Sequence, residues 1–347
     1  MINVGISGIG FMGWIHYLAY QKTPGAQITA ICTRNEVKRS GDWTSIQGNF
    51  GPPGEQVDVS NWSCYSDIDD LLDDEAIDLI DICLPPDLHA DIAKRALQAG
   101  KHVLIEKPMA LTAQDCEEIV AVAKENRRQA LVAHVLPFFP EYTYLRNAVS
   151  SGEYGKLLGG HFNRVISDPL WLGKDFWDES KVGGPLIDLH VHDAHLIRYL
   201  FGMPTSVNTR GRFRGDSVEY CSTIFDFEDS DLVVTASSGV MNQQGRPFMH
   251  NFEAHFEKAT MQFSFATLAD DPEASPFKVF DEEGNVLRPD LGSGDPVDSF
   301  VMEIQEAVSA IESGQPSSLL GGELARDAIT LCHKQAESAR TQKQITL

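Results

Sequence analysis

The first 134 residues alternate between short apolar segments and segments with helical periodicity. Buried strands are predicted at residues 2–7, 27–32, 77–84, 101–105 and 130–134. Helices are predicted between them, at about residues 11–22, 66–72, 87–99 and 112–126, with Asp87 and Thr112 as N-caps. Because strands and helices alternate throughout, this part of the chain is predicted to be α/β, with a parallel, doubly wound sheet.

The pattern changes after Pro140. A helix near residues 141–150 is followed by segments with two-residue alternation, which indicate an antiparallel sheet with one helical segment among its strands. These strands are predicted at residues 157–167, 207–213, 220–227, 232–240, 251–256, 260–265 and 277–280. Amphipathic helices follow at residues 298–313 and 322–341. A chain of 347 residues exceeds one typical domain, and we expect two, residues 1–133 and 134–347.

Glycines follow the first predicted strand directly, in the sequence Gly8-Ile-Gly10-Phe11-Met12-Gly13. In a strand–turn–helix unit Gly8 permits a tight turn, Gly10 lets the backbone approach a pyrophosphate, and Gly13 lets the helix pack on the strand. The helix N-terminus then faces the phosphates. This context favours a dinucleotide-binding site at Gly8, Gly10, Phe11, Met12 and Gly13 over a glycine-rich turn without a ligand.

The end of the second strand bears on the choice of dinucleotide. Sites for NAD usually place Asp or Glu there, about 20 residues past the glycines, on the ribose 2′-hydroxyl. Here Thr33 and Arg34 occupy the position, and the first carboxylate is Glu36. Thr33, Arg34 and Lys38 suit a 2′-phosphate, so the sequence favours NADP. NAD stays open, because Arg34 can also stack on adenine and Glu36 can turn inward.

A second polar cluster lies in the predicted helix that begins near Pro185 and stops at Gly202. Asp188, His192 and His195 are spaced i, i+4 and i+7, which places them on one face of an α-helix. A carboxylate one turn from an imidazole can orient the ring and set its proton affinity. The alternative is a helix that carries polar residues without a function.

Charge restricts the class of partner. The chain has 28 basic and 50 acidic residues, a formal net charge of −22, which argues against nucleic acid or an anionic membrane and suits small-molecule ligands. The six cysteines form no CxxC pair and no zinc-ligand spacing, so we expect reduced thiols in a cytoplasmic protein. The N-terminus lacks the features of a signal peptide, and no apolar run reaches the ~20 residues of a membrane span.

The sequence resembles the glucose–fructose oxidoreductase/inositol dehydrogenase (Gfo/Idh/MocA) family. The likeness rests on the glycine turn, residues 82–89, residues 100–108 with Glu106-Lys107-Pro108, Asp188-x-x-x-His192, and the closing helix in residues 320–346. It implies a Rossmann domain followed by an α/β domain with a large, open, mostly antiparallel sheet. It also implies an NAD(P)-dependent dehydrogenase or reductase that acts on CH–OH groups of sugars, polyols or related small molecules.

The resemblance assigns catalytic roles to Lys107, Asp188 and His192. Lys107 directly follows a predicted parallel strand, where open α/β sheets bind ligands. Hydride transfer from an alcohol needs a base for the hydroxyl proton and a cation near the developing oxyanion, and His192 and Lys107 can supply one each. The resemblance also suggests a cis Lys107–Pro108 bond. It implies further cofactor contacts from Leu84, Pro85, His89, Glu106 and Lys107.

Two departures leave the substrate open. The family often shows Asn and Arg before the proline that matches Pro140, where this chain has residues 134–139 without either. It commonly has an acidic residue three positions after the catalytic histidine, where this chain has His195. Trp171, Phe176 and Trp177 precede the site helix, and we expect Trp171, Trp177 and His195 to line the substrate pocket. Core or interface packing is at least as good an explanation for each aromatic ring.

Other function classes remain open from the sequence. Some relatives are NAD-dependent glycoside hydrolases, which oxidise their substrate only transiently. A non-catalytic NAD(P) sensor would not need Lys107, Asp188 and His192 together. A metal-dependent hydrolase built on His190 and His192 would need further ligands, so we expect no bound metal. Family members are often dimers or tetramers that use the open sheet face, which residues 232–240 would fit.

Overall fold

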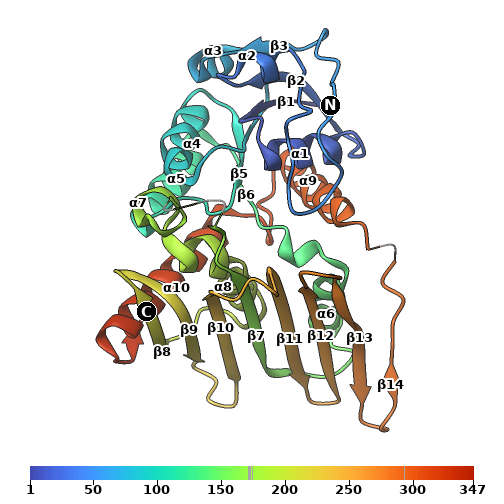
Figure 1. The fold of residues 1–347 in the computed structure, drawn as a ribbon, viewed down its shortest axis with the longest axis vertical. Helices are drawn as coiled ribbons and strands as arrows, with labels where there is room; N and C mark the ends of the chain where they lie inside the picture. Colours follow the sequence, from blue (N-terminus) through green and yellow to red (C-terminus); the bar gives the residue numbers. More distant parts are fainter. Residues whose placement is uncertain (171–172, 174, 293) are drawn as a thin grey trace. The chain divides into compact units, whose positions relative to one another are not determined.

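A computed structural model of the chain describes residues 1–170, 173, 175–292 and 294–347. It divides into two compact units (Figure 1). The first contains residues 1–139 and 293–326, and the second contains residues 140–292 and 327–347. The units are discontinuous in sequence because helix α9 (Pro296–Ser313) packs against α1 (Phe11–Tyr20) of the first unit. The two contiguous domains expected from the sequence, residues 1–133 and 134–347, stay a prediction.

The first unit contains a six-stranded sheet in the order β3-β2-β1-β4-β5-β6. All its strand pairs are parallel, which confirms the doubly wound parallel sheet. The order reverses between β1 and β4, and in such sheets ligands bind at the carboxyl ends of the strands at this point. The strands are β1 (Ile2–Ser7), β2 (Ala26–Cys32), β3 (Ser63–Tyr65), β4 (Leu79–Ile82), β5 (His102–Glu106) and β6 (Ala130–Ala133).

The helices of the first unit start as the sequence predicts in some places and not in others. The Thr112 side chain accepts the Asp115 N–H, which confirms Thr112 as N-cap. The Asp87 cap is wrong, because Pro86–Leu88 forms a 3₁₀ turn and the following helix begins at His89 without a side-chain cap. The other helices are α2 (Glu36–Arg39), α3 (Ile68–Asp73), α4 (His89–Gln98) and α5 (Ala113–Asn126).

The second unit contains a nine-stranded sheet in the order β14-β13-β12-β11-β7-β10-β9-β8-β15. Every neighbouring pair is antiparallel except β7 and β10, which confirms a large, mostly antiparallel sheet. The strands are β7 (Leu157–Ser167), β8 (Ser206–Arg214), β9 (Ser217–Asp226), β10 (Val233–Met241), β11 (Phe248–Phe256), β12 (Ala259–Thr267), β13 (Glu273–Asp281), β14 (Val286–Leu287) and β15 (Ile345–Thr346).

Helices cover one face of this sheet. Helix α6 (Pro140–Ser151) packs Tyr142 on Phe252 and Phe263, and α8 (Val191–Phe201) packs on β7. Gln335 of α10 (Gly322–Thr341) bonds to Thr223 of β9. Alternate residues of β9 point the other way, and Ile224 there is exposed, as is Val233 of β10. In the described part of the chain, no helix is long and apolar enough to cross a membrane.

Candidate dinucleotide and catalytic sites

The glycine turn between β1 and α1 has the geometry that its sequence predicts. Gly8 has φ +98°, and a Cβ on it would lie 2.4 Å from the Cys83 carbonyl oxygen. A Cβ on Gly13 would lie 2.2 Å from the Gly8 oxygen, so neither position accepts a side chain. A Cβ on Gly10 would meet nothing within 4 Å, and no side chain caps α1 at this residue. Open space at an uncapped helix N-terminus fits a pyrophosphate. Phe11 and Met12 beside it are half-buried.

The segment after β2 is joined to the glycine turn by Lys38, a contact that the sequence did not reveal. Lys38 Nζ donates a hydrogen bond to the Ile9 oxygen at 2.7 Å, and partial burial lowers the pKa of Lys38. Thr33 Oγ1 accepts the Asn35 N–H at 3.3 Å. Arg34 is exposed. Thr33 and Arg34, rather than a carboxylate, directly follow β2 in the sequence, although burial and the charges of Asp67 and Asp70 raise the pKa of Cys32 at the strand end.

His89 joins the loops that follow β4 and β5. Its ring is buried, with Nδ1 2.7 Å from the Pro108 oxygen and Nε2 2.7 Å from the Leu84 oxygen. Burial lowers the pKa of His89, although the two carbonyls favour its charged form. The ring therefore fixes Leu84 and Pro85 to the Lys107–Pro108 turn, whose peptide bond is cis, as the resemblance suggested. A direct cofactor contact from His89 stays a prediction.

Lys107 follows β5 and is half-buried. Its backbone N–H donates to Glu106 Oε2 at 3.0 Å, and Glu106 Oε1 lies 3.1 Å from His16 Nε2. His16 Nδ1 lies 2.8 Å from Asp81 Oδ2. This cluster was not predicted from the sequence, although a histidine and an aspartate interrupt apolar runs in α1 and β4.

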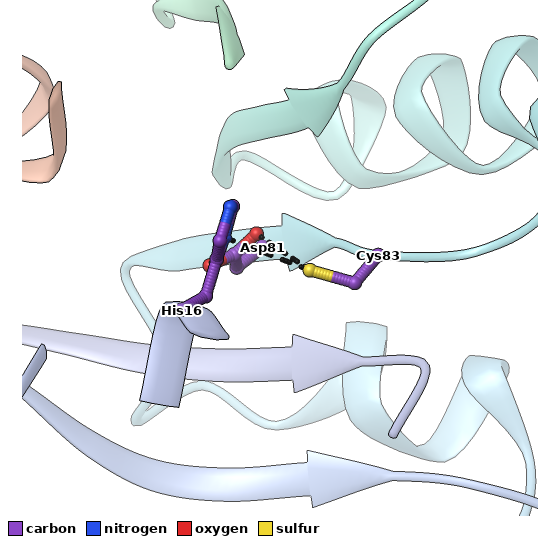
Figure 2. A group of neighbouring side chains, drawn as sticks. All are labelled: His16, Asp81 and Cys83. Carbon is purple, nitrogen blue, oxygen red and sulfur yellow. Dashed lines mark hydrogen bonds and ion pairs between the residues drawn. The ribbon is translucent and has the colours of Figure 1, made fainter. Parts of the chain in front are cut away.

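The cluster also contains Cys83, which directly follows β4. Figure 2 shows His16 of α1 facing Asp81 and Cys83, with Cys83 Sγ 3.4 Å from Asp81 Oδ1 and 3.6 Å from His16 Nδ1. Within the described ranges, these three residues are the one group of ligand-type side chains close enough to hold a metal ion. The group does not include His190 or His192.

In the second unit, Asp188 lies in a π-helical turn, Leu186–His190, and α8 begins after it at Val191. The regular α-helix expected from Pro185 is therefore wrong, because a π turn holds more residues than an α turn and changes their angular positions. Asp188 and His192 are half-buried, whereas His195 is fully buried. That the three side chains share one face stays a prediction.

Buried polar contacts fix this helix on the sheet. Arg164 of β7 makes two hydrogen bonds to Asp193, at 2.8 and 3.1 Å. His190 Nε2 lies 2.9 Å from Gln335 Nε2, and burial lowers the pKa of His190. His190 is thus bonded to another side chain inside the unit.

The aromatic residues before the helix differ in placement. Trp171 lies outside the described residues. Phe176 is buried in the core. Trp177 is half-buried, and the Arg214 guanidinium carbon lies 3.9 Å from its ring centroid. Arg214 is held in turn by hydrogen bonds to Asp168 and Glu219, so the Trp177 ring has a fixed support that the sequence did not indicate.

A parallel sheet with this strand order and glycine turn defines the class of dinucleotide-binding proteins. Matches to two family models identify the family within this class. Residues 2–134 match the model described as "Oxidoreductase family, NAD-binding Rossmann fold", and residues 142–262 match the Gfo/Idh/MocA C-terminal domain. The chain belongs to the Gfo/Idh/MocA family of NAD-binding oxidoreductases.

Similar proteins of known sequence include several dehydrogenases. Levoglucosan dehydrogenase of Pseudarthrobacter phenanthrenivorans is 29% identical over 215 residues, 60% of this chain and 53% of that protein. Inositol 2-dehydrogenase of Salmonella typhimurium is 29% identical over 167 residues, 47% of this chain and 46% of that protein. The uncharacterized oxidoreductase YdgJ of Escherichia coli is 27% identical over 267 residues, 74% of this chain and 71% of that protein. The chain thus aligns with about half the length of the two named dehydrogenases.

Solved structures share the fold over the whole chain. Levoglucosan dehydrogenase in complex with NADH and levoglucosan has a TM-score of 0.79, at 22% identity, with 99% of each chain covered. An oxidoreductase from Agrobacterium radiobacter in complex with NAD⁺, L-tartaric acid and magnesium has a TM-score of 0.74, at 16% identity, covering 99% of this chain and 98% of that one. At these identities the likeness shows the fold alone.

Proposed function

We propose that this oxidoreductase transfers a hydride between NAD(P) and a hydroxyl or carbonyl group of a sugar, a polyol or a related small molecule. The observation that carries the proposal is the open space at Gly10, beside an uncapped helix N-terminus in a Rossmann sheet. Relatives named for levoglucosan and inositol support the substrate class. When bound, the nicotinamide supplies the hydride acceptor or donor.

The protein side of the reaction is proposed for three residues. His192 takes the hydroxyl proton during oxidation and returns it during reduction. The Lys107 ammonium stabilises negative charge on the reacting oxygen. Asp188 orients the His192 imidazole, consistent with its place in the turn before α8. Trp171, Trp177 and His195 are proposed to contact the substrate, and Arg214 supports the Trp177 ring.

The first experiment is a screen of sugars and polyols with NAD and with NADP, followed by nicotinamide absorbance. Sustained formation of reduced cofactor with one substrate would support the proposal. Cleavage of a glycoside without net cofactor turnover would instead identify the NAD-dependent hydrolase class. Failure of every substrate class in both directions would contradict the proposed function.

We propose NADP as the preferred cofactor. Thr33 and Arg34, rather than a carboxylate, directly follow β2 in the sequence, with Lys38 after them, and a 2′-phosphate would find hydrogen-bond donors there. Thr33→Asp would repel that phosphate and offer an acceptor to the 2′-hydroxyl. We expect the ratio of kcat/KM for NADP to kcat/KM for NAD to fall by about tenfold or more.

Thr33→Ser is the matched control for this cofactor test, because it keeps the hydroxyl group and should keep the preference. A wild-type preference for NAD, or an unchanged ratio in Thr33→Asp, would show that the segment after β2 does not select the cofactor.

We also propose a homodimer or homotetramer formed through the open face of the second sheet. The exposed Ile224 and Val233 side chains on that face support the proposal. A cytoplasmic location is proposed as well. All six cysteines lie within the described residues and are free thiols, which suits a reducing compartment. We propose no nucleic-acid or membrane partner and no resident metal.

A further inference from the structure

His16 lies between two carboxylates inside the first unit. Its Nδ1 is 2.8 Å from Asp81 Oδ2 and its Nε2 is 3.1 Å from Glu106 Oε1. The His16, Asp81 and Glu106 side chains are buried, and those of His16 and Asp81 are completely inaccessible to solvent. An ionised carboxylate only accepts hydrogen bonds, so both contacts require the ring to donate from both nitrogens. This geometry is that of an imidazolium.

The groups that face this ring come from four elements. Asp81 and Cys83 belong to β4 and the residue after it, Glu106 to β5, Tyr20 to α1, and Glu303 to α9. Burial raises the pKa of Cys83, Tyr20 and Glu303, which favours the neutral form of each. The carboxylates at hydrogen-bond distance from the ring are those of Asp81 and Glu106.

The neighbours of the ring decide its charge. Burial by itself disfavours the charged form, but Asp81, by its charge and its hydrogen bond, and the adjacent Cys83 oppose burial and hold the pKa of His16 well above its ordinary value. Glu106 then connects the ring to the motif after β5. One oxygen of Glu106 contacts the ring, and the other accepts the Lys107 N–H at 3.0 Å.

We propose that His16 is a positioning residue for Lys107: as an imidazolium that bridges Asp81 and Glu106, it fixes the carboxylate that holds the Lys107 backbone. The inference rests on the catalytic role proposed above for Lys107. It predicts that the reaction depends on the protonation of His16, a residue of α1 that is not expected to contact cofactor or substrate.

The competing hypothesis is that His16, Asp81 and Cys83 bind a metal ion (Figure 2). A ligating nitrogen must direct its lone pair at the metal, whereas both nitrogens of His16 already face carboxylate oxygens. The hydrogen-bonded imidazolium therefore explains the geometry without an ion. Stoichiometric zinc in the purified protein that is lost in Cys83→Ser would overturn the proposal.

The main test is the pH dependence of kcat in Asp81→Asn, which keeps the side-chain shape and removes the charge that favours the imidazolium. In the wild type the bridge is present below the raised pKa of His16 and is lost only as pH rises through it. In the variant the pKa of His16 falls. We therefore expect the decline of kcat at alkaline pH to occur about one to three pH units lower than in the wild type. The KM for the cofactor should stay close to that of the wild type.

An equal loss of kcat at every pH would indicate a merely structural role and would overturn the proposal. His16→Gln should lower kcat by about 10- to 100-fold, the scale of a misplaced catalytic group. The matched control is His102→Gln, at the opposite end of the strand that carries Glu106, where the ring accepts the Gln129 N–H. Its kcat and its pH profile should match the wild type.

A measurement without turnover separates this inference from the proposed function. Nitrogen NMR of the wild-type protein should show both ring nitrogens of His16 protonated at pH 8. A neutral His16 ring at pH 7 would overturn the inference whether or not a substrate is found. If the ring is charged and the substrate screen fails, the proposed function fails and the imidazolium bridge stands.

Discussion

The buried histidines of this protein differ in what their ring nitrogens contact, and their proton affinities differ accordingly. His16 faces two carboxylates and has a raised pKa. His89 faces two carbonyl oxygens and His190 faces the Gln335 amide, and burial lowers the pKa of both. Burial alone thus disfavours a charged ring, and a full negative charge at hydrogen-bond distance reverses the balance.

At the residue scale, Lys107→Ala tests the proposed electrostatic role. We expect turnover to fall by at least about 100-fold, because removal of one donor from a developing oxyanion costs this much. The unfolding midpoint should change little, since the backbone N–H that bonds to Glu106 is kept. Near-normal kcat in a folded Lys107→Ala protein would exclude a catalytic role for this lysine.

The buried pair of Arg164 and Asp193 should contribute to stability rather than to chemistry. Asp193→Ala would leave the buried guanidinium without its two hydrogen bonds, at a cost of about 3–5 kcal/mol in the free energy of unfolding. Urea unfolding measures this loss. Asp229→Ala, which breaks an exposed pair with Lys156, is the control and should leave the unfolding midpoint unchanged. Equal midpoints for the two variants would contradict the prediction.

At the scale of elements, the sequence predicted the helices and strands that have a regular local pattern of apolar residues. The strand at Leu157–Ser167 and the helix at Gly322–Thr341 appear with the predicted bounds, because each has a long, regular period. Strand β3 was missed, since its three residues include no apolar run. The π turn before α8 was also missed, because its extra residue changes the hydrogen-bond pattern without a signal in hydrophobic spacing.

The start of α5 offers a prediction at this scale. Thr112 caps the helix through the Asp115 N–H, so Thr112→Ala should lower the free energy of unfolding by about 1 kcal/mol, and Thr112→Ser should lower it less. Chemical denaturation measures both. Asp87→Ala is a contrasting control, because Asp87 does not cap α4. A larger loss in Asp87→Ala than in Thr112→Ala would contradict this assignment of caps.

At the scale of the whole molecule, the sequence predicted the parts of the site that are contiguous. The glycine turn and Glu106-Lys107-Pro108 lie directly after strands, so their place follows from strand prediction. The polar residues that interrupt α1 and β4 mark two members of the His16 bridge, but their pairing could not be predicted, since the partners lie 65 and 90 residues along the chain. Only the strand order β1-β4-β5 brings these residues together.

Assembly can be tested on the open face of the second sheet. We expect sedimentation velocity to show a dimer or tetramer, and expect Val233→Glu together with Ile224→Glu to shift it toward the monomer, since charge on a buried apolar interface is unfavourable. Val286→Glu is the control, because it adds a charge at an exposed side chain of the short strand β14. A wild-type monomer at micromolar concentration would contradict the proposed assembly.

Helix α9 determines when the first unit can complete its folding during translation. Phe300 and Glu303 of α9 pack around His16, so the ion cluster in the first unit is completed by residues near the end of the chain. A nascent chain must therefore emerge beyond residue 313 before α1 is covered on this side, on the order of ten seconds or more after residue 139 has been made. During translation, the first unit can therefore be completed only after residues 140–292 of the second unit have been synthesised.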